Sequence, residues 1–279
     1  MSVMLEGINI DYKSLMNIES LFIKDLNIST NISKYTNLYK LTNLKFLIFE
    51  TNEYILDKIK LPKSLISLDI IFNICDEYVN LSFINHFDKL EYLSINSGCI
   101  YEIYINEIPK SLKVLKTNIT FINKSILYNS NLLSIKFINC DTTSLILPQS
   151  TISLEFNNTF TYDYTCLESL INLKELILKK CYIGNLNTVK ISNNIEKLNI
   201  INISNKPYNN DIIDIVEFIV KLDNIKIFEC VMDDNECINC IIKNNHDRCN
   251  HNILLYILAL LNGNNILSTN EKNKKIYLI

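Results

Sequence analysis

Apolar residues recur along this chain in a short phrase whose spacing is that of a strand. In LKELILKKCYI, residues 173–183, apolar positions alternate over six residues and are followed by Cys181 and Ile183. Alternation with a period of two predicts a β-strand that is buried on one face. The phrase occurs ten times, and the first apolar residue of each copy is called its anchor. The anchors are Ile18, Leu44, Leu65, Leu90, Leu112, Leu132, Thr151, Leu173, Ile195 and Ile225.

The spacing of the anchors predicts a stack of repeats. They run from residue 18 to residue 225, so the nine intervals average 23 residues. A regular period of this length indicates an architecture in which each repeat is one structural unit. One strand with its return leg cannot cover its own apolar face, so neighbouring repeats must cover it. We therefore expect a parallel sheet with continuous columns of leucines inside, each worth about 1.5–3 kcal/mol on burial.

Two further regularities accompany the anchors. Eight residues after an anchor, the side chain is often one that can hydrogen-bond within a turn. These residues are Asn52, Asn73, Thr120, Cys140, Thr159 and Cys181, whereas four repeats have Leu26, Gly98, Ile203 and Asp233 there. Repeats that open on N-L or K-L also alternate with repeats that open on a proline–serine phrase, such as LPKSL (61–65) and IPKSL (108–112). This alternation indicates that a unit of two repeats was duplicated.

The phrase L-x-x-L-x-L-x-x-[N/C/T]-x-L, found over about residues 5 to 232, resembles the leucine-rich repeat. Its LPxSLxxLxI form is similar to the repeats of bacterial leucine-rich effectors and of the FNIP family of amoebae and giant DNA viruses. The composition, typical of an AT-rich genome, is similar to that of repeat families in insect poxviruses. The resemblance implies an α/β leucine-rich-repeat solenoid of about ten repeats at 1–232. It would be curved, with a parallel sheet on the concave face and irregular or 3₁₀ return legs on the convex side.

The remaining segment, 233–279, is expected to form a helical C-terminal cap. Just before this segment, an amphipathic pattern predicts a helix at about 211–222, and the final repeat strand follows at 225–230. Residues 252–263, NILLYILALLNG, predict a second helix that covers the open end of the solenoid. A membrane-associating helix is the alternative for this segment. The lysine-rich tail is expected to add an edge strand or to fray.

Side chains that alternate with the buried leucines should face the concave surface. In the second half of the chain these are Lys136, Glu155, Glu175, Ile177, Lys179, Lys197 and Glu229. Exposed aromatic and apolar side chains on adjacent strands commonly mark interaction sites. The partner-binding candidates are Phe22, Phe46, Ile48, Ile71, Tyr92, Glu155, Glu175 and Lys179. The alternative is that flanking loops cover the apolar members, or that codon bias scatters Ile and Phe.

One cysteine- and histidine-rich segment, CINCIIKNNHDRCNH, is a candidate metal site. It contains Cys237, Cys240, His246, Cys249 and His251. Thiolates and imidazoles of this kind bind zinc tetrahedrally. The spacing approaches that of a zinc knuckle without matching it, and the glycine and aromatic residues of that motif are missing. Zinc binding by Cys237, Cys240, His246 and Cys249 is one hypothesis, and a metal-free capping segment is the other. No further cofactor is expected.

Composition argues against several classes of function. The net charge is −3, from 27 basic and 30 acidic residues along the chain, so we expect neither nucleic acid nor a membrane as partner. The N-terminal residues do not resemble a secretory signal, and no apolar run is long enough for a membrane span. Nine cysteines, several at one repeat position, indicate buried, reduced thiols. We expect a cytoplasmic protein, in the host-cell cytoplasm if the source is a virus.

The function predicted from these features is non-catalytic binding of a protein on the concave face. The motifs G-x-S-x-G, H-E-x-x-H and G-x-x-x-x-G-K are absent, and His86 falls in a return loop, so no enzyme is expected. A second hypothesis is an adaptor, of the ubiquitin-ligase type or a viral host-interaction factor. It would recruit a cellular machine through the C-terminal segment. An enzyme without a recognisable motif is a third, and the oligomeric state is open.

Overall fold

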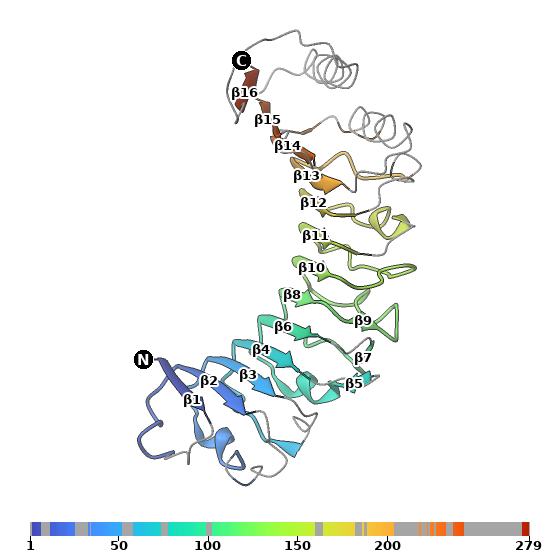
Figure 1. Ribbon diagram of the computed structural model, residues 1–279. Coiled ribbons are helices and arrows are strands. Elements are labelled where there is room, and N and C mark those ends of the chain that lie inside the picture. Colours follow the sequence, from blue (N-terminus) through green and yellow to red (C-terminus); the bar gives the residue numbers. More distant parts are fainter. Residues whose placement is uncertain are drawn as a thin grey trace. The chain divides into compact units, whose positions relative to one another are not determined.

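Every predicted repeat strand is present in the computed structural model of the protein, and each begins two residues after its anchor (Figure 1). The structure describes residues 2–6, 12–25, 33, 35–51, 58–73, 78–98, 102–159, 164–181, 186, 189–203, 218, 222, 224–225, 227–232, 237–242 and 275–278. The chain divides into two compact units, Met1–Asp141 (unit 1) and Thr142–Ile279 (unit 2). The predicted boundary near residue 232 stays a prediction.

Unit 1 contains a parallel sheet in the order β1-β2-β3-β4-β6-β8-β10. The bounds are β1 Ser2–Glu6, β2 Ser20–Asp25, β3 Phe46–Thr51, β4 Ser67–Phe72, β6 Tyr92–Ser97, β8 Val114–Thr117 and β10 Ser134–Ile138. Equivalent positions of the repeats pair with each other, as Leu21 with Leu47 and Leu47 with Leu68. These leucines are at most 1% exposed and form the predicted column. The in-register pairing of parallel strands around buried columns is that of a leucine-rich-repeat solenoid.

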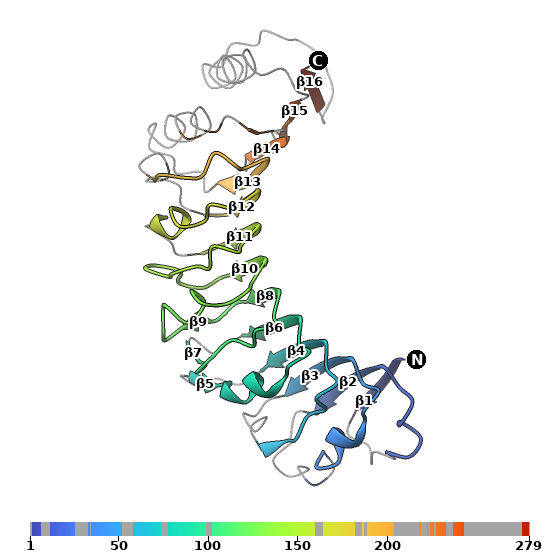
Figure 2. The ribbon, with the colours of Figure 1, turned by 180° about the vertical axis from the view of Figure 1, so that it is seen from behind.

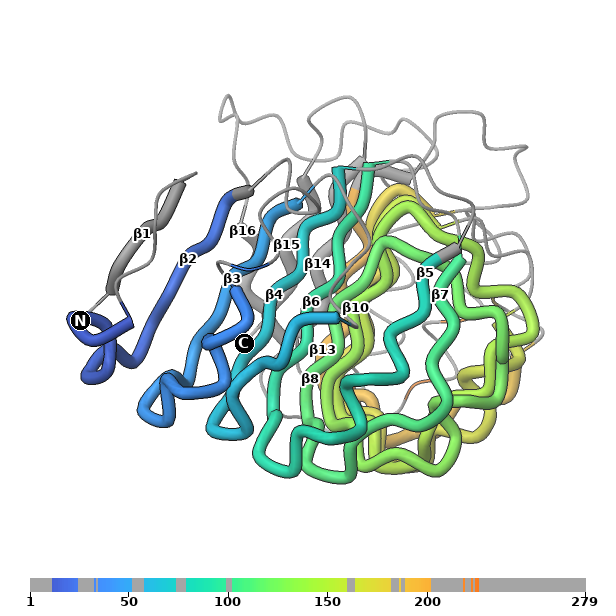
Figure 3. The backbone as a smooth tube through the Cα atoms, turned by 90° about the horizontal axis from the view of Figure 1, so that it is seen from below, coloured from blue at the N-terminus to red at the C-terminus, as the bar shows by residue number. Residues whose placement is uncertain are grey.

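The return legs of unit 1 carry a second, smaller sheet, which the sequence did not predict (Figure 2). Its strands are β5 Tyr78–Asn80, β7 Glu102–Tyr104 and β9 Thr120–Phe121, and all are parallel. Its central residues Val79, Ile103 and Phe121 pair in register and are at most 2% exposed. Seen along the stack, β5 and β7 lie on the opposite side of the coil from β4 and β6 (Figure 3). The core therefore lies between two ladders in this part of the unit.

Short 3₁₀ helices form other parts of the return legs, as predicted. They are η2 Leu38–Lys40 and η4 Ser82–His86 in unit 1 and η5 Thr165–Leu167 in unit 2. Each buries at least one apolar side chain, for example Leu38 and Ile84. A return leg this short has no room for a long helix, so one 3₁₀ turn supplies an inward apolar contact.

Unit 2 continues with β11 Ser153–Asn157, β12 Glu175–Lys179, β13 Lys197–Ile203 and β14 Ile227–Met232, which pair in parallel. The column of Leu154, Leu176 and Leu198 is fully buried. Two more strands follow, β15 Cys237–Ile242 and β16 Lys275–Leu278. Strand β15 runs antiparallel to β14, whereas β16 is parallel to β15. The fully parallel sheet that the repeat pattern predicts therefore ends at β14.

The helical C-terminal cap falls largely outside the described residues. Residues 252–263 lie wholly outside them, and of 211–222 only Phe218, which is helical, and Leu222 are described. Both of these side chains are 1% exposed, so they contribute to the core. Both helices stay predictions, and strand β16 shows that the tail adds an edge strand.

The predicted turn position is buried in the three repeats that carry Cys140, Thr159 and Cys181, which are 4%, 4% and 2% exposed. The Cys181 thiol donates to the backbone carbonyl of Lys179 at 3.1 Å and lies 3.5 Å from the Thr159 hydroxyl. Burial raises the pKa of this thiol. Cys181 is thus a structural group of the turn, because a nucleophilic cysteine requires a lowered pKa.

Candidate protein-binding face

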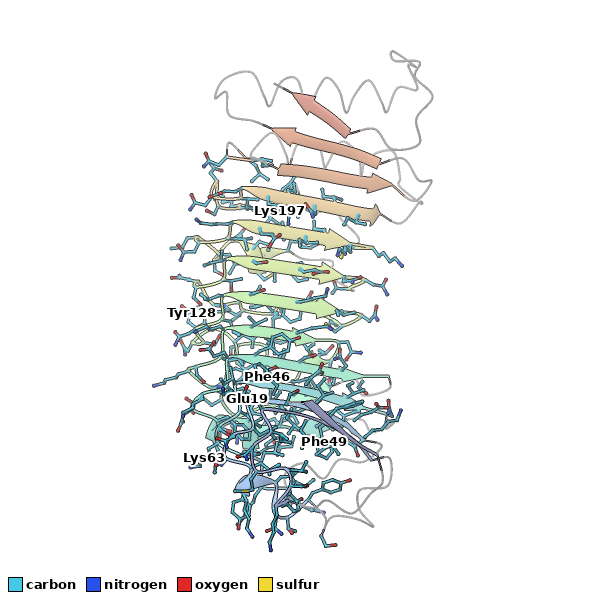
Figure 4. All side chains as sticks on the ribbon, turned by 90° about the vertical axis from the view of Figure 1, so that its left-hand side faces the viewer. Glu19, Phe46, Phe49, Lys63, Tyr128 and Lys197 are labelled. Carbon is cyan, nitrogen blue, oxygen red and sulfur yellow. The ribbon has the colours of Figure 1, made fainter. Side chains whose placement is uncertain are left out.

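The sheet face of unit 1 consists of the side chains that point away from the core on β2, β3, β4, β6, β8 and β10. On β3 burial alternates along the strand, with Leu47 and Phe49 buried and Phe46 and Ile48 exposed. Figure 4 looks onto the strands and labels Phe46 together with its buried neighbour Phe49. A strand places successive side chains on opposite faces, so burial of one set fixes the exposure of the other. This alternation positions the candidate binding residues.

Phe46 and Ile48 are the most exposed of the predicted binding residues. They are 46% and 40% exposed, so a large part of each side chain is accessible. Phe22 pairs in register with Ile48, and Tyr92 lies two strands from Phe46 in the same row. Phe22, Ile71 and Tyr92 are half-buried. The apolar group is therefore centred on β3, and the other predicted aromatics extend it along the sheet.

Polar and charged side chains surround this apolar group. Lys24 of β2 forms an ion pair with Glu50 of β3 at 3.3 Å. On the β4 and β6 side, the Asn96 amide donates to Asp69 at 3.3 Å and to Ser94 at 2.9 Å. An apolar centre with a hydrogen-bonded rim is the arrangement that protein–protein interfaces have.

The sheet face of unit 2 is built from ion pairs. Glu175 accepts hydrogen bonds from the Ser153 hydroxyl at 2.7 Å and from the Lys197 ammonium at 2.5 Å. Burial acts to raise the pKa of Glu175, but these two donors outweigh it, so the pKa lies below its usual value. Lys179 lies 3.3 Å from Glu155. The predicted binding residues thus form two separate ion pairs, Glu155 with Lys179 and Glu175 with Lys197.

These ion pairs have a structural role within the sheet of unit 2. Partly exposed pairs of this type are worth about 0–1 kcal/mol each. They also place opposite charges on neighbouring strands, which favours the register of the sheet. The side chains of Glu175, Lys179 and Lys197 already have partners within unit 2, and a binding protein would have to replace them. Glu229 lies on β14, at the register position next to Asn199.

A row of hydrogen bonds at the start of each strand was missed from the sequence. The residue before each anchor is often Asn or Ser, and its side chain donates to a backbone carbonyl of the preceding repeat. Where Asn precedes the anchor, its side-chain amide donates a hydrogen bond to a backbone carbonyl of the preceding repeat. The acceptor is the residue two positions before the anchor of that repeat. The described examples are Asn43, Asn131, Asn172, Asn194 and Asn224, with bonds of 2.7 to 3.0 Å.

In the repeats that open on a proline–serine phrase, a serine hydroxyl makes the bond to the preceding repeat instead of an Asn amide. The hydroxyls of Ser64 and Ser111 reach the carbonyls of the preceding anchors, Leu44 at 2.6 Å and Leu90 at 2.8 Å. The proline carbonyl then accepts the anchor's own N–H, as Pro109 does from Leu112 at 3.0 Å. The two alternating forms are therefore two ways of satisfying backbone carbonyls between repeats. The signal was visible as the recurring N-L and S-L pairs.

In unit 2, members of this row line a groove of ≈ 630 Å³. The groove is lined by Ser150, Ile152, Asn172, Lys174, Asn194, Glu196 and Asn224. The three Asn amides donate to the preceding repeats, and Lys174 lies 3.6 Å from Glu196. The polar groups that line it therefore already serve the stack, and the apolar face of unit 1 is the better binding candidate.

The zinc hypothesis stays a prediction. Cys237 and Cys240 both lie on β15, at register positions opposite Val231 and Phe228 of β14. His246 and Cys249 lie outside the described residues. In the described part of the chain, no three metal-ligating side chains cluster. His86 ends η4, in a return leg as predicted.

Comparisons with known proteins give a structural likeness only. The chain is similar to the crystal structure of an internalin (InlF) from Listeria monocytogenes, with a TM-score of 0.36 and 17% identity. The match covers 84% of this chain and 64% of the internalin, so the chain spans less than two thirds of that protein. No protein-family model matches the chain. No curated protein matches it either. The strand register and buried columns described above establish the solenoid on their own.

Proposed function

We propose that this chain is a non-catalytic protein-interaction module whose partner docks on the sheet face of unit 1. The observation that carries the proposal is the exposure of Phe46 and Ile48 on a strand whose alternate side chains, Leu47, Phe49 and Thr51, are buried. Leu47 and Phe49 anchor this strand in the core, and β2 and β4 pair with it on both sides. A partner would meet two apolar side chains that are already ordered, so little conformational entropy is lost on binding.

The surroundings of the apolar pair support a protein partner. Net charge is −3 for the whole chain, which offers no general attraction for nucleic acid. In the part of the chain that the structure describes, no helix has the length and apolar character needed to cross a membrane. An apolar centre with a rim of Lys24, Glu50, Asp69 and Asn96 matches the anatomy of a protein interface. We place this activity in the cytoplasm, as the buried thiols suggest.

The test compares substitutions of equal exposure on opposite sides of unit 1. Phe46→Asp introduces a charge into the apolar group, whereas Tyr39→Asp changes a return-leg residue that is also 46% exposed. Anchor residues at interfaces typically contribute about 2 kcal/mol or more, or about 30-fold in affinity. We expect Phe46→Asp to weaken partner capture by at least that factor and Tyr39→Asp to leave it unchanged. Equal capture by both folded variants would rule out the proposal.

A further inference from the structure

Two aromatic side chains lie on either side of a small one on the sheet face of unit 1. Phe46 of β3 and Tyr92 of β6 both pair in register with Ser67 of β4, which lies between them. Neighbouring strands are about 4.8 Å apart, so the backbones of the two aromatic residues are about 9.6 Å apart. A flat group in van der Waals contact with both rings needs about 7–8 Å between them. The spacing therefore leaves room over Ser67 for one planar side chain of a partner.

A carboxylate without a counter-charge lies beside this space. Asp69 follows Ser67 on the same face of β4, is half-buried, and accepts a hydrogen bond from the Asn96 amide at 3.3 Å through one oxygen. Its other oxygen is accessible and accepts no hydrogen bond from the residues that the structure describes. Glu50 on the next strand, by contrast, pairs with Lys24 at 3.3 Å. Cations are attracted both to a carboxylate and to the faces of aromatic rings.

We propose that the partner inserts an arginine side chain between Phe46 and Tyr92 and that Asp69 binds its guanidinium group. This inference rests on the proposed function, since it names the chemistry of the partner on the same face. A guanidinium group is planar, so it can stack on an aromatic ring while its N–H groups donate to a carboxylate. A lysine ammonium is a point charge that does not stack, and an uncharged side chain would leave the carboxylate without a counter-charge.

Neighbouring side chains restrict where the arginine can enter. In the row of Asp69, the residue on β6 is Ser94, which is fully buried, and the residue on β8 is Lys116. Lys116 lies two strands from Asp69, about 9.6 Å, and repels a cation on that side. On the other side of Asp69, Ile48 is 40% exposed and offers an apolar contact for the alkyl part of the arginine. The arginine therefore lies toward β3, against the apolar group.

The test uses a displayed library of random 12-residue peptides, selected on the full purified chain. We expect the enriched peptides to combine an arginine with an aromatic or aliphatic residue. A synthetic copy with citrulline at the arginine position keeps the shape of the side chain and removes its charge. This copy should bind about tenfold more weakly, because a hydrogen bond between charged groups is lost. Asp69→Asn should weaken binding of the arginine peptide equally and leave binding of the citrulline peptide unchanged, since both changes remove one interaction.

The matched control is Glu102→Gln, which removes an exposed carboxylate from β7, on the opposite side of the coil (Figure 3). It should change binding by less than about twofold, because screened surface charges contribute little. Tyr92→Leu retains an apolar side chain but removes one ring, and it should weaken binding of the arginine peptide by about fivefold.

The outcomes separate the inference from the proposed function, with Phe46→Ala as the variant that tests the face without adding a charge. If the enriched peptides lose binding to Phe46→Ala but carry no excess of arginine, or bind Asp69→Asn as they bind wild type, the inference is overturned and the proposed function stands. If no peptide is enriched, or if Phe46→Ala binds the enriched peptides as wild type does, both are overturned. Thermal unfolding of Asp69→Asn at the wild-type temperature shows that this variant is folded.

Discussion

The serine hydroxyls at the start of the strands allow a direct test of how the repeats are joined. The hydroxyl of Ser111 lies 2.8 Å from the carbonyl of Leu90 and 3.3 Å from that of Phe87, and it is partly buried. Ser111→Ala removes this donor. A hydrogen bond of this type contributes about 0.5–1.5 kcal/mol net, and a partly buried carbonyl left without its donor adds to the loss. We expect the free energy of unfolding to fall by about 1–2 kcal/mol.

The measurement is urea-induced unfolding followed by circular dichroism, with Ser67→Ala as the matched control. Ser67 lies on the sheet face of the same unit, at the start of β4, and among the described residues its hydroxyl makes no such bond to the preceding repeat. Its replacement should change the free energy of unfolding by less than about 0.5 kcal/mol. Ser111→Thr, which retains the hydroxyl, should recover most of the loss. Equal effects of Ser111→Ala and Ser67→Ala would refute the proposed role of the serine.

Three further predictions concern unit 2. Leu176→Ala empties a fully buried site in the leucine column and should lower the free energy of unfolding by about 2–5 kcal/mol, measured in urea. Lys180 has φ of 51°, a left-handed conformation that costs a non-glycine residue about 1–2 kcal/mol, so Lys180→Gly should raise stability while Lys174→Gly lowers it. The pKa of Glu175 lies below its usual 4.5, so the ionised carboxylate stabilises the folded protein. This contribution is fully present above pH 4.5 and is lost as the pH falls through the lowered pKa. The stability difference between wild type and Glu175→Gln should therefore be largest near neutral pH and vanish in strong acid, and a pH-independent difference would contradict this.

The repeat was predictable because its signal is local and redundant. Each of the ten anchors, such as Leu44 and Leu173, is followed two residues later by a strand. The strands could be predicted because a strand that is buried on one face requires alternating apolar residues. The side chains that face away from the core followed from the same alternation. The alternation alone therefore predicts that Phe46 and Ile48 are exposed.

Other features depend on contacts between repeats, and a single repeat does not contain them. The β5-β7-β9 ladder pairs Val79, Ile103 and Phe121, which come from different repeats. The antiparallel β15 follows the last regular repeat, where no periodic signal remains.

The central claim is that a partner protein contacts the sheet face of unit 1 at Phe46. The most direct measurement places a photo-crosslinking phenylalanine analogue at position 46 in cells of the native source. The same analogue at position 39, equally exposed on a return leg, is the control. We expect a discrete crosslinked protein from position 46 and none of that species from position 39. Crosslinking of the same protein from both positions, or from position 39 alone, would contradict the claim.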